Sequence, residues 1–380
     1  MKPRLTLVAL GLLLVASVGR AEPDPQGRPE SRPLSRPQLS AEQAAAHTTA
    51  AYLGDWAPAP LADLAGAPPD AVVRPGESVQ AAIDRAPALG GNSTRRWVIH
   101  IEPGTYRGPL CIKDKAPLAL VGTALDAAAV VLVDNRFSGK PKGEQTPAHP
   151  CIPELGKATI GTGGSTTLLV QSPDVQLISL TIANDAMDGV RRGEPYPPGV
   201  GESGGAQAVA LTLAGDRIQL ENVRLLGHQD TLFARRAAPG QPARQLIRHS
   251  LIAGDVDFIF GNAVLVIEHS TILTRAHRRT PGHGGIILAP STAPDVGQGF
   301  LVTHSRLVGE PGIAPGATAL GRAWDSGVKA GTWVAGSSPN GLAVVRDSEI
   351  GAHVGPWAAS TSRRPFDAAT HRLSEYNNRP

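Results

Sequence analysis

The chain has 380 residues, which is enough to bury a large core as one long domain or two smaller ones. Its basic residues exceed its acidic residues by three, but residues 1–21 contain three basic residues and no acidic one. The rest of the chain is therefore formally neutral. Overall charge gives no reason to expect a nucleic-acid partner, and we expect none.

Residues 1–21 have the pattern of a cleaved secretory signal peptide. Lys2 and Arg4 precede an apolar run over residues 5–18, and Gly19-Arg20-Ala21 provides a small-residue cleavage site. The run is too short to span a membrane, no other apolar run is long enough, and no cysteine near the cleavage site could carry a lipid. We therefore expect a secreted or periplasmic protein without a membrane anchor.

Residues 22–70 are expected to form a disordered, Pro-rich lead-in, because their first half is dominated by proline and arginine. Within this segment Ser40 is a good N-cap and Glu42 suits the first turn of a helix. One short helix is therefore predicted from Ala41 to about residue 53. The ordered domain is predicted over residues 71–380.

The chain has two cysteines, Cys111 and Cys151. In an exported protein an even pair favours a disulfide, with two unpaired core thiols as the alternative. Nothing pairs them at metal-ligand spacing, so a metal role is not expected.

A repeated pattern begins at Val175. Each copy is a short β-type run, one small or polar residue, and a second short run. The middle position holds Ser179, Asn222, His249, His269, His304 and Asp347. The smallest spacing between copies is 20 residues, the length of one turn of a β-solenoid, and longer spacings indicate turns with inserted loops.

This repeat predicts an all-β parallel β-helix, in which each coil buries its apolar face against the next. A β-sandwich is the alternative, but it needs hairpin turns about every 8 to 12 residues. The recurring histidines His249, His269 and His304 then form a ladder at one corner, so they are not catalytic candidates. His277 and His283 lie in a Gly-rich loop without a carboxylate or cysteine at ligand spacing, and no metal site is expected there.

Two aspartates occupy equivalent places in consecutive copies. Asp230 lies eight residues after Asn222, and Asp257 lies eight residues after His249. Strands in a sheet are about 4.8 Å apart, so the two carboxylates should lie close together. One of them should then have a raised pKa and stay protonated, which gives an acid beside a base or nucleophile. A pair of solvated edge aspartates is the alternative, and the apolar residues around Asp257 argue against it.

Other polar and aromatic residues support a site at this place. Gln207 opens a strand that should lie one coil before Gln229, and glutamine amides can donate to an oxyanion. Arg322 could hold one aspartate ionised, and Trp324 offers a flat face for a sugar ring. Each of these residues alone would more often be structural.

Four blocks of this sequence resemble the signature blocks of pectin methylesterases. They are Gln-Ala-Val-Ala-Leu (207–211), Gly-His-Gln-Asp-Thr-Leu-Phe (227–233), Gly-Asp-Val-Asp-Phe-Ile-Phe-Gly-Asn (254–262) and Leu-Gly-Arg-Ala-Trp (320–324). The resemblance extends from about Val72 to the end of the chain. It implies a right-handed, single-stranded parallel β-helix, a pectin-lyase-like solenoid.

The resemblance also implies a role for each site residue. Asp257 would be the nucleophile, Asp230 the acid and then the base, and Arg322 the residue that orients Asp257. Gln207 and Gln229 would hold the oxyanion. The sugar subsites would be lined by Phe260, Trp324 and Phe233.

The implied reaction is hydrolysis of the methyl esters of polygalacturonate to pectate and methanol, in pectin degradation and plant cell wall modification. It requires no metal and no cofactor, and the implied partner is methyl-esterified homogalacturonan (pectin), bound by a monomer.

Some positions depart from the pattern of the family. His228 stands where an aromatic residue is common and Ala323 where proline is usual, and we expect both to alter the shape of the subsites without affecting the chemistry. The tail from Glu375 to Arg379 is similar to a Gram-negative branch, some of whose members have lost the second block and have been proposed to be thioesterases. This chain keeps all five polar site residues.

Two other functions fit parts of the sequence. Gly201-Glu-Ser203-Gly-Gly205 has the spacing of a serine hydrolase nucleophile elbow, but the elbow needs a strand before it and a helix after it. A non-catalytic carbohydrate-binding β-helix would use the same aromatic residues, but it has no need of paired aspartates and paired glutamines.

Overall fold

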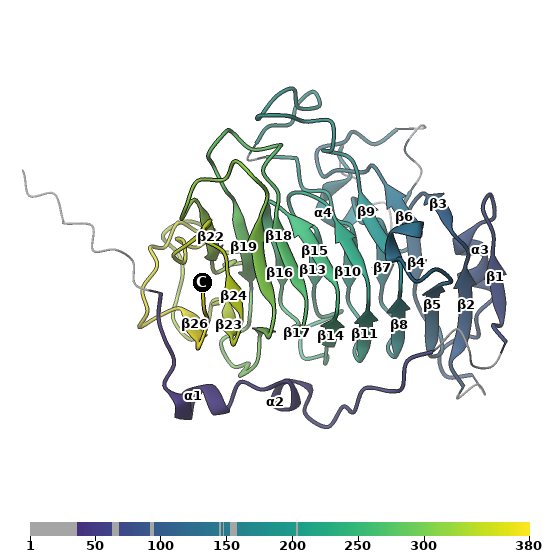
Figure 1. Cartoon of the computed structure of the whole chain (residues 1–380), viewed down its shortest axis with the longest axis horizontal. Helices are drawn as coiled ribbons and strands as arrows, with labels where there is room; N and C mark the ends of the chain where they lie inside the picture. The colour runs from purple at the N-terminus through teal and green to yellow at the C-terminus, as the bar shows by residue number, and fades with distance from the viewer. Residues whose placement is uncertain are drawn as a thin grey trace, which may run out of the picture. The chain divides into compact units, whose positions relative to one another are not determined.

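The computed structural model describes residues 36–62, 68–91, 95–143, 146, 148–152, 158–202 and 204–380. The predicted signal peptide and Ser203 lie outside these residues. Over the described part, the chain coils into a right-handed parallel β-helix, as the repeat and the resemblance predicted (Figure 1).

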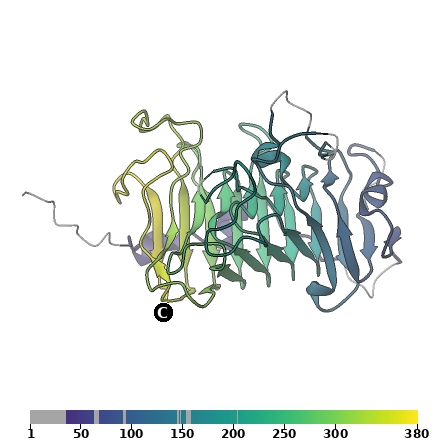
Figure 2. The same cartoon turned by 90° about the horizontal axis from the view of Figure 1, so that it is seen from above.

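Three parallel sheets form the sides of the coil. Sheet 1 has ten strands: β1 (Ala71–Val73), β2 (Trp97–Ile101), β5 (Leu118–Gly122), β8 (Val175–Ile178), β11 (Ile218–Glu221), β14 (Arg244–Arg248), β17 (Val264–Glu268), β20 (Phe300–Thr303), β23 (Leu342–Arg346) and β26 (Arg372–Tyr376). Sheet 2 has eight: β3 (Gly104–Arg107), β6 (Val130–Asp134), β9 (Thr181–Asn184), β12 (Arg224–Leu226), β15 (Leu251–Gly254), β18 (Thr271–Thr274), β21 (Arg306–Gly309) and β24 (Glu349–Ile350). Sheet 3 has eight: β4 (Leu110–Ile112), β7 (Leu168–Val170), β10 (Leu211–Leu213), β13 (Leu232–Ala234), β16 (Val256–Gly261), β19 (Ile286–Pro290), β22 (Thr318–Gly321) and β25 (Val354–Gly355). Figure 2 shows the strands of successive coils side by side.

Short helices complete the described structure. They are α1 (Ala41–Ala45), α2 (Thr49–Leu53), α3 (Val79–Asp84), α4 (Gly161–Gly164) and the 3-10 helix η1 (Ala127–Ala129). None of the helices in the described ranges is long and apolar enough to cross a membrane.

The core is a column of apolar side chains stacked coil on coil. In sheet 1, Leu177, Leu220 and Ile247 are register partners on successive strands, and the column continues through Ile267 and Val302. All five are fully buried. Burying a side chain of this size contributes about 1.5 to 3 kcal/mol, so the stacking of like residues is a main source of stability.

The repeated polar position forms the corner between sheets 1 and 2. Its six residues all have a positive φ, between 47° and 52°. This left-handed conformation bends the chain sharply, and Asn, Asp and His adopt it more readily than most residues. The rings of His249, His269 and His304 follow one another with centroids 5.6 and 5.3 Å apart. They form the ladder that the sequence predicted.

A second ladder stands beside the first and was not foreseen. The residue after each ladder histidine is serine, and each hydroxyl accepts a backbone N–H from the coil before it. Ser250 accepts from Val223 at 3.0 Å, Ser270 from Ser250 at 3.1 Å, and Ser305 from Ser270 at 3.1 Å. These bonds satisfy N–H groups at the corner, where the sheet ladders are interrupted.

The N-terminal segment differs from its prediction in two ways. The expected single helix from residue 41 to 53 is two helices, because Thr48 accepts a hydrogen bond from Ala51 N–H and starts a new helix. The cap at Ser40 is as predicted, and Gln43 completes a capping box with it.

The second difference is that residues 36–62 are not a loose lead-in. Tyr52, Leu53 and Trp56 are buried against outward-facing residues of sheet 1, among them Leu246 and Leu301. The pairing of Arg36 with the buried Glu375 fixes the start of this segment. Figure 1 shows α1 and α2 running past several strands of this sheet. The burial of these three large apolar side chains orders the segment, although its composition is typical of a linker.

The predicted disulfide between Cys111 and Cys151 is present. It joins strand β4 to a loop 40 residues further along the chain.

Candidate active site

The two aspartates lie at equivalent places on neighbouring coils. Leu232 and Phe233 of β13 pair with Ile259 and Phe260 of β16, and the same register carried back two residues places Asp230 beside Asp257. The backbone N–H of Asp230 donates to the carbonyl of Val256 at 3.0 Å. The equal offsets in the sequence thus correspond to one position on adjacent strands, which are about 4.8 Å apart.

Both aspartates have a left-handed backbone conformation. The φ angle is 66° at Asp230 and 48° at Asp257. Residues other than glycine adopt this conformation at a cost, and such residues cluster at functional sites. Aspartate adopts it more readily than most residues, and the two angles show that the chain bends in the same way at this level of both coils.

The electrostatic environment separates the roles of the two carboxyl groups. Burial raises the pKa of Asp230 well above its usual value, and the charge of Asp257 raises it further, while Arg322 opposes the shift. Asp257 instead forms a two-pronged ion pair with Arg322, whose Nε lies 2.9 Å from Oδ1 and whose Nη2 contacts Oδ2. A carboxyl group whose environment favours its protonated form therefore lies beside a carboxyl group that is held and oriented by an arginine.

The two glutamines adjoin this pair. Gln229 directly precedes Asp230, and Gln207 lies one coil earlier, where the N–H of Ala208 donates to the carbonyl of Gln229 at 3.1 Å. The strand expected from Gln207 is shorter than predicted, since β10 begins at Leu211. Within the described residues, the amide oxygens of both glutamines are buried without a hydrogen-bond partner. These oxygens are acceptors, whereas the oxyanion role that the sequence suggested would use the N–H groups of the same carboxamides.

The three aromatic residues form one cluster. The rings of Phe233 and Phe260 stack with centroids 4.3 Å apart, and Trp324 lies edge-on, 5.6 Å from Phe260 and 6.0 Å from Phe233. Phe260 is only 4 % exposed. Phe233 and Trp324 are therefore the ones that present a surface, and Phe260 supports them from below.

Two hollows lie along these strands. One, of about 430 Å³, is lined near the start of the strands by Gln229, Val256 and Arg322. The other, of about 600 Å³, is lined near their far end by Phe233 and Trp324. The aspartates sit between these two sets of residues in the chain. An extended ligand could therefore contact the polar and the aromatic hollow together.

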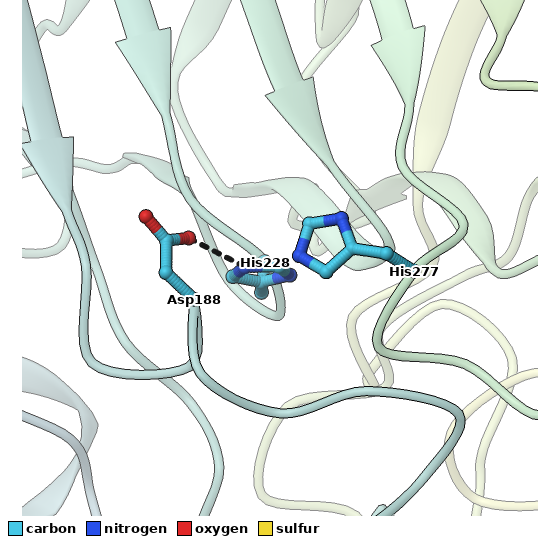
Figure 3. Close-up of side chains that lie close together, drawn as sticks. All are labelled: Asp188, His228 and His277. Carbon is cyan, nitrogen blue, oxygen red and sulfur yellow. Dashed lines mark hydrogen bonds and ion pairs between the residues drawn. The ribbon is translucent and has the colours of Figure 1, made fainter.

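His228 is not where the sequence led us to expect it. Instead of shaping a subsite it is fully buried, with Nε2 2.8 Å from Asp188 and Nδ1 3.1 Å from Asp255 (Figure 3). Asp188 is 40 residues away in the sequence, so no local motif pointed to this contact. His277 lies with its ring edge-on to His228, the ring centroids being 4.9 Å apart.

The groups of Asp188, His228 and His277 lie close enough to be tested as a metal site. Arg275, however, lies 3.2 Å from Asp188 Oδ1 and 3.5 Å from His277 Nε2, so a guanidinium already supplies positive charge there. Both nitrogens of His228 are also engaged by carboxylates. These contacts do not favour a metal ion, and the expectation of a metal-free protein stays a prediction.

The described residues before and after position 203 do not match a nucleophile elbow. The described elements nearest in sequence are β9, which ends at Asn184, and β10, which begins at Leu211. In the described chain, neither a strand directly before Ser203 nor a helix directly after it is present.

Comparison with known proteins gives consistent results. The family model described as pectinesterase matches residues 198–330. Pectinesterase B of Dickeya dadantii is 36% identical over 79% of this chain and 75% of its own. The structure of rice weevil pectin methyl esterase has a TM-score of 0.76 at 30% identity, covering 91% of this chain and 97% of that one. The crystal structure of Escherichia coli ybhC has the same TM-score at 27% identity, covering 95% and 98%.

Proposed function

The chain belongs to the pectinesterase family and is a carboxylic ester hydrolase acting on the methyl esters of pectin, and we propose that Asp257 and Asp230 perform its chemistry. The observation that carries this proposal is that Asp230, whose pKa burial and the charge of Asp257 raise, lies beside an Asp257 that is paired with Arg322.

The first half of the reaction forms an acyl-enzyme. A carboxylate oxygen of Asp257 attacks the carbonyl carbon of the methyl ester, and the oxyanion accepts hydrogen bonds from the carboxamides of Gln207 and Gln229. The C–O bond to the methoxy group then breaks, and Asp230 gives its proton to the departing oxygen. Methanol leaves, and a mixed anhydride between the substrate and Asp257 remains.

The second half regenerates the enzyme. Asp230, now a carboxylate, takes a proton from a water molecule, whose oxygen attacks the galacturonyl carbon of the anhydride. The bond to Asp257 breaks, Asp257 leaves as a carboxylate, and the product carries a free carboxyl group. One ester and one water thus yield one acid and one methanol, with Asp230 protonated again.

The substrate contacts follow from the two hollows. We assign sugar-ring contacts to Phe233 and Trp324, because apolar ring faces pack on aromatic surfaces, with Phe260 beneath them. The substrate of this account is methyl-esterified homogalacturonan, bound by an exported monomer that serves pectin breakdown and the modification of plant cell walls.

Methanol release from methylated pectin tests the proposal. Wild type should release methanol, Asp257→Ala and Asp257→Asn should lose about a thousandfold or more of the rate, and the exposed control Asp84→Asn should keep it. Ser203→Ala should also stay active. Loss of activity in a folded Ser203→Ala protein, or thiol release from acyl thioesters without methanol release from pectin, would refute the assignment.

A further inference from the structure

His228 and Asp255 form a second pair directly behind the aspartates. His228 lies two residues before Asp230, and Asp255 lies two residues before Asp257. The backbone N–H of Asp255 donates to the carbonyl of His228 at 3.1 Å, and their side chains meet at 3.1 Å. The same two coils that carry the reacting carboxyl groups are therefore joined twice, by main chain and by side chain.

A carboxylate faces each ring nitrogen of His228. Burial alone would raise the pKa of both carboxyl groups. Hydrogen bonds from Arg278 and His228 instead lower the pKa of Asp255. Hydrogen bonds from His228 and Arg275 lower the pKa of Asp188. Two ionised carboxylates can only accept, and each faces one ring nitrogen of His228. Both ring nitrogens of His228 therefore face hydrogen-bond acceptors.

The pair extends outwards to a long loop. Arg278 donates to both oxygens of Asp255 and, through Nη1, to the hydroxyl of Tyr196 at 2.7 Å. Asp188 and Tyr196 lie on the segment between β9 and β10, so both ends of the network bind this segment to the catalytic coils. The side chains of His228, Asp255 and Arg278 are fully buried.

Stability alone does not account for such a network. Replacing a buried ion pair by apolar residues of similar volume is often neutral or stabilising, so buried charges are better explained where they fix a geometry. Here the network fixes the position of one coil relative to the next. Asp230 lies on one of these coils and Asp257 on the other, and the two side chains must be aligned for the reaction.

We propose that His228 is a positioning residue for the esterase reaction: as an imidazolium between Asp188 and Asp255, it sets the turn that carries Gln229 and Asp230 against the strand that carries Asp257. This inference rests on the proposed function. His228 does not contact the substrate, and its effect is on the alignment of the groups that do.

The kinetic test uses His228→Phe, which fills the space but cannot donate, and His228→Gln, which can keep one of the two bonds. His353→Gln is the matched control, because His353 is buried and, among the described residues, its side chain hydrogen-bonds only the neutral hydroxyl of Thr274. We expect kcat to fall about 10- to 100-fold in His228→Phe and less in His228→Gln, with KM within about twofold of wild type, because a small misplacement of reacting groups lowers the rate by up to about 100-fold. The control should keep the kcat of wild type.

A melting temperature measured on each variant separates alignment from folding. A His228→Phe protein that melts like wild type and keeps its kcat within about twofold would overturn the proposal, and so would a loss that matches its unfolded fraction.

A second measurement does not depend on activity. In ¹⁵N-histidine-labelled protein at neutral pH, NMR should show a proton on both ring nitrogens of His228, and Asp255→Asn should change this signal. A singly protonated His228 would overturn the inference even if wild type releases methanol. If wild type releases none, the proposed function fails, and the NMR result still decides whether the charged pair exists.

Discussion

Asp230→Asn should make the protein more stable, and the gain should grow with pH. The wild-type carboxyl is buried and has a pKa well above its usual value, first through burial and then through the charge of Asp257. In the unfolded chain the same group ionises near pH 4. Between these two pKa values the native state holds one more proton than the unfolded state, so wild-type stability falls as pH rises.

The slope of this effect follows from linkage. One proton of difference corresponds to about 1.4 kcal/mol for each pH unit in that window. Asparagine is nearly isosteric and does not titrate, so the unfolding free energy of Asp230→Asn relative to wild type should increase by about that amount per unit above pH 4. It should level off above the native pKa of Asp230.

Urea unfolding at constant ionic strength across this range measures the difference. Asp216→Asn is a control of opposite sign: burial would raise the pKa of Asp216, but its bonds to Arg244 and the charge of that residue lower it. That variant should be less stable than wild type by an amount that stays constant above pH 4. A difference between Asp230→Asn and wild type that is flat with pH, or that favours wild type more as pH rises, would refute the proposed environment of Asp230.

Three further predictions address other parts of the structure. Gln229→Ala should lower kcat for methanol release about 10²- to 10³-fold with little change in KM, since the oxyanion contact strengthens in the transition state, and an unchanged kcat would exclude this role. Trp324→Ala should raise KM for polymeric pectin about 2- to 10-fold while kcat stays within twofold, and unchanged binding would remove Trp324 from the sugar contacts. Leu220→Ala should lower the unfolding free energy by about 2 to 5 kcal/mol in urea titrations, because it opens a cavity in the fully buried column, whereas a loss under 1 kcal/mol would mean that the column is loosely packed.

The features that the sequence predicted well are those that repeat at a fixed offset. The coil, the histidine ladder and the stacking of Asp230 on Asp257 all follow from the spacing of equivalent positions along the chain. Because equivalent residues stack on successive coils of a β-helix, equal spacing along the chain predicts that these residues lie close together.

The features that the sequence did not predict depend on contacts between unrelated segments. Tyr52 and Trp56 bury themselves on sheet 1 although the segment around them looks like a linker. His228 meets Asp188 only because a long loop folds back over the coil. No local pattern or repeat in the sequence predicts either contact, so each is found only in the three-dimensional structure.

We propose that Asp230 is a neutral acid beside the arginine-paired Asp257 in the resting protein. Infrared difference spectroscopy between wild type and Asp230→Asn at neutral pH measures this directly. We predict that wild type has a carbonyl band of a protonated carboxyl group that is missing in Asp230→Asn and retained in the exposed control Asp84→Asn. If only carboxylate bands change in Asp230→Asn, Asp230 is ionised, and the proposed division of roles between the two aspartates is wrong.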